Sequence, residues 1–428
     1  MLQTVRNAWR IPELRRKILF TAFILVIYRF GAAIWVPFIN VEALQEVFNL
    51  NFADTVFGMY DMMSGGAFSQ ATIFAMSIQP YINASIIMNL LSVGIPALER
   101  MVKEGGEEGR KKIASITRFL TVGLGILMGF AYYSTLRSFG LVTPDNIMTA
   151  FVIVMTFTAG TAFIMWLGEQ ITEFGIGNGI SIILFASIVS RGPSIVSQGY
   201  TGIVSGALQW WALILILLLA VAIVAFVVFI TQAERRIPIQ YAKRMVGRKM
   251  YGGQSTHLPL KVNMSGVMPI IFAQTFASFP STIAAFFPDP AVGSLMSGFL
   301  NMIKYGSPLY AGAYLLLIIG FSYFYTAIQF NPIEIANNLK QNGGFIPGFR
   351  PGKPTADFIK KVLNKITLFG ALFLGVIAIM PIAMSSMVNV PGLAWGGTSV
   401  LIVVGVALET VKQLESQMLM RHYKGFLE

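Results

Sequence analysis

Long apolar segments separated by short polar ones dominate this chain. Ten of them are each close to the ~20 helical residues that cross ~30 Å of hydrocarbon. They cover roughly residues 18–39, 71–97, 113–136, 147–168, 179–199, 209–231, 264–287, 308–330, 366–388 and 394–413. Each is predicted to be a helix, because an isolated strand would leave backbone N–H and C=O groups without partners in lipid. The pattern therefore predicts an all-α polytopic membrane protein with ten transmembrane helices.

The composition agrees with this fold class. Hydrophobic residues make up 55% of the 428 residues, charged residues make up 12%, and the mean hydropathy is +0.69. A soluble domain of this length would need more charge on its surface. No cleavable signal peptide is expected, because the first apolar run is too long and lacks a small-residue cleavage site. The chain has no cysteine, which excludes disulfides and thiolate metal sites.

Positive charge is distributed unevenly between the predicted loops. In the ten-helix arrangement, 27 of the 31 Lys and Arg residues fall on one side of the membrane and three on the other, with Arg29 inside the first helix. Positively charged loops stay in the cytoplasm, so both termini are predicted to be cytoplasmic. The net charge of +12 thus indicates topology before it indicates a binding partner.

Ten helices divide into two sets of five. We predict an N-terminal half at 18–200 and a C-terminal half at 201–413, with a cytoplasmic segment at 1–17 and a tail at 414–428. Because five is odd, the halves enter the membrane from opposite sides, which permits inverted halves around a central pathway. The glycine-rich stretch 57–67 is too short to span the membrane. It is either an ordinary external loop or a re-entrant element that fills a cavity.

The sequence offers little for catalysis. Its two histidines, His257 and His422, fall in predicted cytoplasmic segments, and it contains no HExxH, P-loop or GxSxG string. No catalytic residue, metal site or cofactor is therefore predicted. Arg29 is the one clear charge inside a predicted helix, whereas ion-coupled transporters usually keep a relay of such groups. A solute transporter with alternating access and a membrane scaffold without a pore are the alternatives to a channel.

A few polar residues interrupt the second and seventh apolar helices. They are Gln79, Asn83, Asn89, Gln274 and Thr275. Amide and hydroxyl groups hydrogen-bond between membrane helices for about 1 kcal/mol. That energy suits either a permanent helix contact or a seam that opens.

Two polar loops, at about residues 232–263 and 331–365, are longer than a connection between helices requires. Between Arg235 and Asn263 the first carries seven basic residues and no acid. The second is rich in proline and glycine and cannot form one regular helix. Exposed loops that carry arginine suit an acidic protein surface or RNA phosphate.

Several strings, in order along nearly the whole chain, resemble the SecY family, the protein-conducting channels of the general secretory pathway. They are Gly65–Ser69 with Gln79–Ile86, Met165–Glu173 running into Gly175–Ile182, Arg235–Arg244 with Gln254–Asn263, Phe330–Glu334 with Asn337–Lys340 and Pro347–Gly352, and Gly396–Ser399. Together they are far more specific than any one of them alone.

The resemblance implies a passive pore for unfolded secretory polypeptides, with lateral release of transmembrane segments into the bacterial cytoplasmic membrane. It implies no enzymatic activity of its own. The expected partners are SecE- and SecG-type small membrane subunits, a SecA-type ATPase motor, the ribosome with its RNA, signal sequences, unfolded polypeptide substrates and membrane lipids.

The resemblance also assigns roles to residues. The implied pore ring, here called the predicted ring, consists of Ile78, Ile82, Ile180, Leu184, Ile271 and Ile402. The implied plug, here called the predicted plug, consists of Phe57, Gly58, Met59, Tyr60, Asp61, Met62, Met63, Ser64, Gly65, Gly66, Ala67, Phe68 and Ser69. The implied lateral gate consists of Ile86, Asn89, Leu90, Gln274 and Thr275. The implied docking residues for motor or ribosome are Arg235, Arg236, Lys243, Arg244 and Arg350. From composition alone, the isoleucines of the ring would be ordinary packing or lipid-facing residues.

Overall fold

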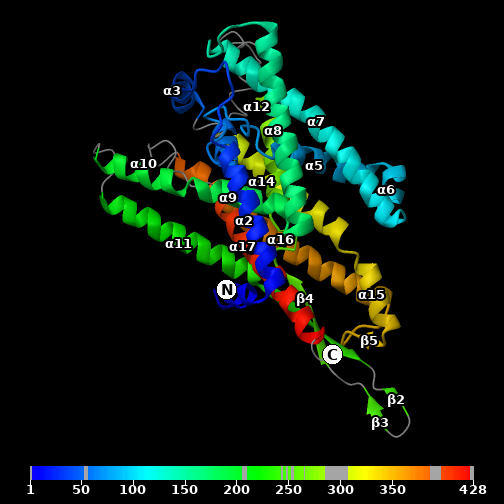
Figure 1. Cartoon of the computed structure of the whole chain (residues 1–428). Helices are drawn as coiled ribbons and strands as arrows, with labels where there is room; N and C mark the ends of the chain where they lie inside the picture. Colours follow the sequence, from blue (N-terminus) through cyan, green and yellow to red (C-terminus); the bar gives the residue numbers. More distant parts are fainter. Residues whose placement is uncertain are drawn as a thin grey trace.

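The computed structural model describes residues 2–52, 56–204, 210–241, 244–246, 249–251, 255–264, 266–284, 307–385 and 397–424. Within them the helices are α1 (Leu2–Arg10), α2 (Pro12–Gly31), α3 (Val41–Asn51), α4 (Val56–Ser64), α5 (Gln79–Gly94), α6 (Pro96–Lys103), α7 (Gly106–Ser138), α8 (Ile147–Phe174), α9 (Gly179–Ser190), α10 (Gly192–Val204), α11 (Trp210–Gln232), α12 (Met268–Ala284), α14 (Pro308–Gln329), α15 (Pro332–Gln341), α16 (Lys353–Ser385) and α17 (Gly397–Lys424). The chain is thus predominantly helical (Figure 1).

Each of the ten predicted apolar runs overlaps a helix, namely α2, α5, α7, α8, α9, α11, α12, α14, α16 and α17. Four stretches among the described residues are long and apolar enough to span a membrane unaided, in α7, α8, α14 with α15, and α16. The pair α5–α6 passes the same test jointly but bends by 105° at its break, and α9, α11 and α12 contain shorter apolar helices. The predicted class of polytopic helical membrane protein is confirmed.

Local chemistry explains where several helices begin and end. The Asn178 side chain accepts hydrogen bonds from the backbone N–H groups of Ile180 and Ser181, which caps the start of α9. Pro96 opens α6, and the extended conformation of the residue before it, Ile95, ends α5. The 105° bend between these helices follows from that break.

A small sheet, which the hydropathy pattern does not predict, occupies the two polar loops. Its strands β1 (Glu234–Tyr241), β4 (Ser255–Lys261) and β5 (Gly344–Phe345) lie in the order β4-β1-β5, and β2 (Arg244–Val246) pairs with β3 (Lys249–Tyr251). β1 and β4 are antiparallel, from Glu234 opposite Lys261 to Gln240 opposite Ser255. Because β5 also pairs with β1, the two loops form one body.

The sheet has a core of its own beyond the helices. Ile237 and Ile239 alternate with exposed residues on β1 and are buried. They pack in a cluster with Leu260 and with side chains from α15 and α16.

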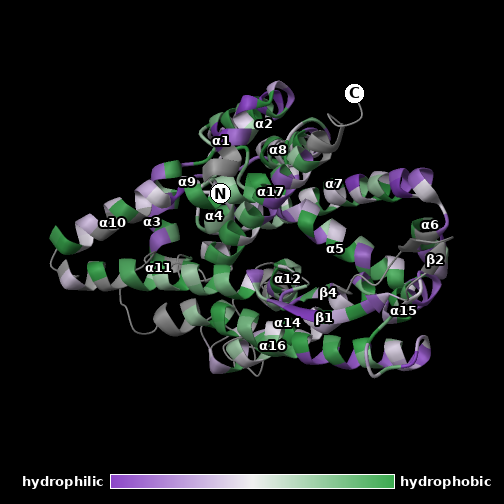
Figure 2. Cartoon of the chain, turned by 90° about the horizontal axis from the view of Figure 1, so that it is seen from below, coloured by the Kyte–Doolittle hydropathy of each residue, from purple (hydrophilic) through white to green (hydrophobic). Residues whose placement is uncertain are grey.

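Both termini lie at the end of the molecule where this sheet lies (Figure 1). Hydrophilic residues gather on β1 and at one end of α7 and of α16, whereas hydrophobic residues cover α11 (Figure 2).

Three large clusters of buried side chains hold the helices together. One joins α11, α12, α14, α16 and α17, and another lies within residues 36–157. The third takes side chains from α2, α4, α5, α8, α9, α12 and α17 and so lies at the centre of the molecule. The division into halves at residues 200 and 201 stays a prediction.

Candidate functional site

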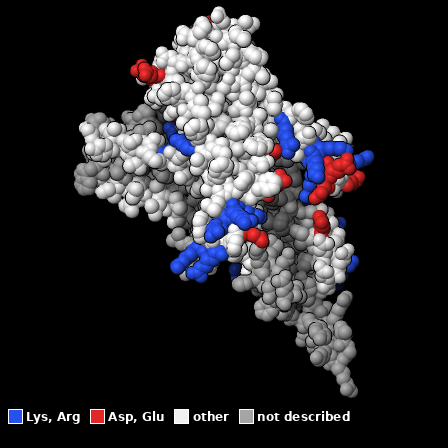
Figure 3. Space-filling view, viewed as in Figure 1, with Lys and Arg blue, Asp and Glu red and all other residues white. Residues whose placement is uncertain are grey.

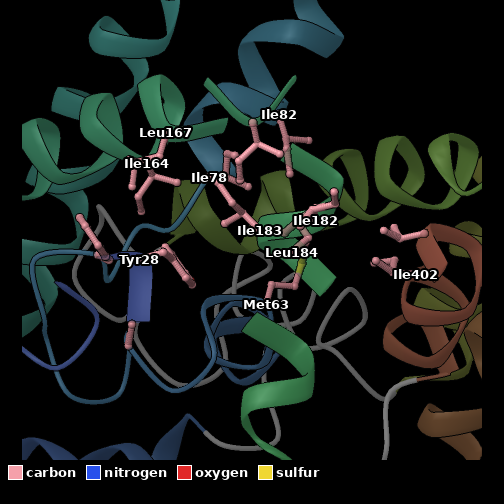
Figure 4. Packing of buried hydrophobic residues seen from close by; sticks show 14 of the residues in the cluster. Tyr28, Met63, Ile78, Ile82, Ile164, Leu167, Ile182, Ile183, Leu184 and Ile402 are labelled. Carbon is pink, nitrogen blue, oxygen red and sulfur yellow. The ribbon is translucent and has the colours of Figure 1, made fainter. Parts of the chain in front are cut away.

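The six residues of the predicted ring come together in the central cluster. Five of them are buried, with exposed fractions of 0% for Ile78, 8% for Ile82, 4% for Leu184, 8% for Ile271 and 3% for Ile402. The sixth, Ile180, is partly buried and packs against the same cluster. Residues from α5, α9, α12 and α17 therefore meet in one apolar centre (Figure 4).

Helical spacing explains how four elements supply six side chains. Ile78 immediately precedes α5 and Ile82 lies four residues later, so the two share one face. Ile180 and Leu184 repeat that spacing on α9. The six side chains of the predicted ring are branched and apolar, so they offer no ligand to an ion, and dehydrating an ion there is costly.

The predicted plug lies directly against this centre. It consists of α4 and the turn after it, and its Met63 and Ala67 belong to the central cluster. Figure 4 shows Met63 beside Leu184. The Gln274 side chain donates a hydrogen bond to the Met63 sulfur, with Nε2 and Sδ 3.5 Å apart. The segment is therefore a short helix in the interior of the protein, in agreement with the re-entrant interpretation and not with an exposed external loop.

Aromatic contacts seat the other side of the predicted plug against α7. The rings of Phe68 and Tyr132 lie with centroids 4.3 Å apart, and Phe57 stacks on Phe68 at 5.8 Å. The Tyr132 hydroxyl donates to the backbone carbonyl of Phe68, with the oxygens 2.6 Å apart. Beside these contacts remains a small cavity of about 40 Å³, lined among others by Tyr60 and Met76. The side chain of Met59 lies outside the described residues.

The residues of the predicted gate do not all lie at one seam. Ile86 is buried in the central cluster, and Leu90 packs against that cluster. Gln274 lies on α12, the helix that contributes Ile271 to the same cluster. The Thr275 hydroxyl has two acceptors for its one proton, the Asn83 side-chain carbonyl across the gap between α12 and α5 at 3.3 Å and the backbone carbonyl of Ile271 within α12 at 3.0 Å. Asn89, by contrast, is exposed, and its backbone carbonyl accepts a hydrogen bond from Ser92 within the same helix.

Asn83 contacts the helix α12 but is not among the residues of the predicted gate. The sequence marks it as a polar residue of the second apolar helix, whereas the resemblance assigns Asn89 to the gate. The available signal was its position directly after Ile82, which places it at the edge of the apolar centre. The role of Asn89 stays a prediction.

The predicted docking residues lie on and beside the sheet. Arg235 and Arg236 are exposed on β1, and Arg236 pairs with Glu234 at 2.7 Å. Arg350 is exposed in the turn after β5, where its backbone carbonyl accepts a hydrogen bond from the Thr355 hydroxyl at 2.8 Å. Lys243 lies outside the described residues, and for Arg244 the structure describes the strand but not the side chain.

Two contacts give the Arg350 turn a defined shape. Phe349 stacks on Phe358 of α16 with ring centroids 4.2 Å apart. Upstream, Phe345 of β5 lies opposite Gln240 of β1. The turn that carries Arg350 is thereby fixed between α16 and β5, which pairs with the end of β1 opposite to Arg235 and Arg236.

Charge is concentrated away from the apolar centre. On the face shown in Figure 3, most Lys and Arg side chains lie in the lower part and on the side near α6, and the uppermost part shows acidic side chains but no basic ones. Within the described part of the chain, no group of three or more His, Cys, Asp or Glu side chains is arranged to hold a metal ion.

These features define the class: a multi-pass α-helical membrane protein whose helices converge on a closed apolar centre, with a short buried helix against it and a basic sheet at one end. The family model described as SecY matches residues 72–411. The protein translocase subunit SecY of Streptomyces scabiei is 46% identical over 440 residues, covering 100% of both chains. That of Thermotoga maritima is 45% identical over 442 residues, covering 100% of this chain and 98% of the relative.

Solved structures agree on the fold. One described as the structure of a protein conducting channel superposes with a TM-score of 0.65 at 18% identity, over 94% of this chain and 92% of that one. Sec61 from a canine ribosome-channel complex superposes with a TM-score of 0.61 at 17% identity, over 94% and 92%. The chain belongs to the SecY family.

Proposed function

We propose that this protein is a protein-conducting channel of the bacterial cytoplasmic membrane. It passes unfolded secretory polypeptides across the membrane and releases transmembrane segments sideways into the lipid. The observation that carries the proposal is the closed apolar centre, found in a chain 46% identical over its full length to proteins named protein translocase subunit SecY.

The channel is passive in this proposal, and its partners supply the energy. A SecA-type ATPase pushes the chain, or a translating ribosome feeds it, and SecE- and SecG-type subunits complete the membrane complex. Both termini and the basic sheet face the cytoplasm. Arg235, Arg236 and Arg350 are each exposed, which suits contact with acidic side chains or RNA phosphate.

The predicted ring acts as a flexible collar. Branched aliphatic side chains make no directional bonds, so they can close around polypeptides of any sequence while still excluding hydrated ions. The predicted plug covers the apolar centre on the external side of the membrane when no polypeptide is present. Exit toward lipid occurs between α5 and α12, where the hydrogen bond from Thr275 to Asn83 spans the gap. One such bond is worth only about 1 kcal/mol, which allows the seam to open.

The test is reconstituted transport. The protein is placed in proteoliposomes with its small subunits, and a SecA-type motor, ATP and an unfolded secretory precursor are added. The proposal expects ATP-dependent protection of the precursor from external protease. Omission of ATP and vesicles without this subunit are the controls. A correctly assembled complex that takes up small solutes saturably without any motor, and never protects a precursor, would instead establish a transporter.

A further inference from the structure

A buried ion pair ties the predicted plug to the wall of the molecule. Asp61 of α4 is 2% exposed, and its Oδ2 lies 2.7 Å from Nη1 of Arg191, whose side chain is 20% exposed. Arg191 is the residue that caps the C-terminal end of α9. Among the ion pairs between described residues, this one is the most deeply buried.

A second cation contacts the predicted plug at the end of its helix. Arg29 of α2 donates from Nη1 to the backbone carbonyl of Gly65 at 3.3 Å and to the Ser190 hydroxyl at 3.2 Å. The C-terminal end of a helix carries partial negative charge, so a cation is favourable there. The end of α4 is therefore held by arginines from two different helices, α2 and α9.

The backbone at this point fits its surroundings closely. Gly65 has φ +73°, a conformation that favours glycine, and a Cβ there would come within 2.8 Å of the Ser190 hydroxyl and 2.9 Å of the Ser187 carbonyl. The Tyr28 hydroxyl, which hydrogen-bonds the Ser187 hydroxyl at 2.7 Å, also donates to the Ser64 carbonyl at 3.4 Å. The segment thus sits against α9 in one definite position.

The Asp61 carboxylate also organises the predicted plug internally. Its Oδ1 accepts the backbone N–H of Ser69 at 2.8 Å, which ties α4 to the turn that follows it. If the segment moves as a unit, the Ser69 contact travels with it. The ion pair with Arg191 breaks, together with the hydrogen bonds from Arg29, Tyr28, Tyr132 and Gln274. The carboxylate is therefore placed to separate from the wall without unfolding the segment.

The apolar and polar contacts contribute differently. Packing of Met63 and Phe68 is non-directional and would tolerate small displacements. The ion pair is directional and buried, so loss of one partner leaves an unpaired charge in a poorly solvated site. When the segment leaves, both charges become hydrated, which lowers the cost of separating them.

We propose that Asp61 and Arg191, supported by Arg29, form a latch that keeps the predicted plug closed and sets how often the channel opens without a polypeptide. This inference rests on the proposed function, because it presupposes that the segment seals the pore.

The variants Arg191→Gln, Asp61→Asn and the double variant test the latch. Arg191→Gln leaves the buried Asp61 carboxylate unpaired in the closed state only, so it favours the open state most strongly. We expect its resting ion conductance to rise by about tenfold or more. The double variant restores a neutral pair, and we expect it to leak less than Arg191→Gln alone. A merely misfolded site would leak more with each added substitution.

The measurement is resting conductance in planar bilayers, on the complex with its small subunits and without motor or precursor. The control is Asp145→Asn, which removes the 2.9 Å ion pair between Asp145 and Arg137. The side chains of Arg137 and Asp145 are 60% and 46% exposed, and neither residue belongs to the predicted plug. It should leave the conductance unchanged. Deletion of residues 57–67 serves as the fully unplugged reference.

The outcomes separate the latch from the function on which it rests. If the deletion leaks while Arg191→Gln does not, the latch is wrong and the plug assignment stands. If Arg191→Gln leaks but the double variant leaks at least as much, the ion pair is not the cause and the latch is also overturned. If even the deletion does not leak, the predicted plug seals nothing and both proposals fail.

Discussion

Two neighbouring isoleucines of α12 give a matched test of the apolar centre. Ile271 is 8% exposed and belongs to the central cluster, whereas Ile270 is 0% exposed and belongs to the cluster formed by α11, α12, α14, α16 and α17. They share the same helix and side-chain volume but lie in different clusters. Replacing either by alanine should reduce the free energy of unfolding by about 2–5 kcal/mol. Only Ile271→Ala should also open the pore.

The size of that effect follows from the buried carbon atoms. Ile271→Ala removes three carbons from contacts that exist only when the centre is closed, at about 0.8 kcal/mol each. The closed state then loses about 2.4 kcal/mol relative to the open one, a shift of about 50-fold in their ratio. Ile271→Val removes one carbon and should give a shift of about fourfold. Ile270 packs in the other cluster, outside the apolar centre, so Ile270→Ala should not change the ratio.

Resting ion flux through proteoliposomes that contain the assembled complex measures this ratio. Thermal unfolding of the same preparations measures stability. We expect a graded leak, with alanine above valine above isoleucine at position 271, and no leak from Ile270→Ala despite a similar loss of stability. Equal leaks from the two alanine variants would refute the reasoning, because the leak would then report loosened packing and not a pore collar.

Three further predictions address docking, the seam and the helix packing. Arg350→Glu reverses the charge of the exposed turn after β5. It should weaken binding of the motor by about 2–5 kcal/mol and abolish motor-driven precursor protection, while assembly with the small subunits is normal. Normal export by this variant would remove Arg350 from the docking surface. Thr275→Val deletes the hydrogen bond to Asn83 and should raise crosslinking of weakly hydrophobic signal sequences to lipid by about threefold to fivefold. Unchanged crosslinking would show that this bond does not hold α5 and α12 together. Gly179→Ala places a Cβ against the carbonyl oxygen of Gly168 and should destabilise the complex by about 1–3 kcal/mol in thermal unfolding, whereas Gly192→Ala, which meets open space, should not.

The helices of this fold follow from sequence patterns because they are local. An apolar run of sufficient length in lipid has to satisfy its own backbone groups, so the ten runs could be predicted without knowledge of their neighbours. The bend between α5 and α6 has its cause in Pro96, although its size depends on the packing of the two helices.

The sheet could not be foreseen in the same way. Ile237, Ile239 and Tyr241 alternate along β1, but three positions around a proline are too few to predict a strand inside a basic loop. Its partner β5 begins at Gly344, so the pairing is decided by contacts between distant parts of the chain. The hydrophobic periodicity of a local segment carries no information about such long-range contacts.

The candidate site likewise combines residues that the sequence identifies with contacts that only the folded chain creates. The resemblance assigned all six ring positions, and the structure brings them into one cluster, yet their role stays a proposal. In the sequence, Asn83 is recognisable as a polar residue of an apolar helix, and Arg191 is one of the three basic residues predicted on the external side. Their partners, Thr275 and Asp61, are 192 and 130 residues away along the chain, and only the folded structure pairs them.

The central claim is that polypeptides pass through the apolar centre formed by the predicted ring. Because the chain has no cysteine, Ile82→Cys gives it a single thiol in that centre. A secretory precursor with one cysteine and a tag that blocks complete passage is added with the motor and ATP, and disulfide formation is measured. We predict a crosslink at position 82 that requires both ATP and precursor. No crosslink there, with the same precursor bound elsewhere on the protein, would contradict the account.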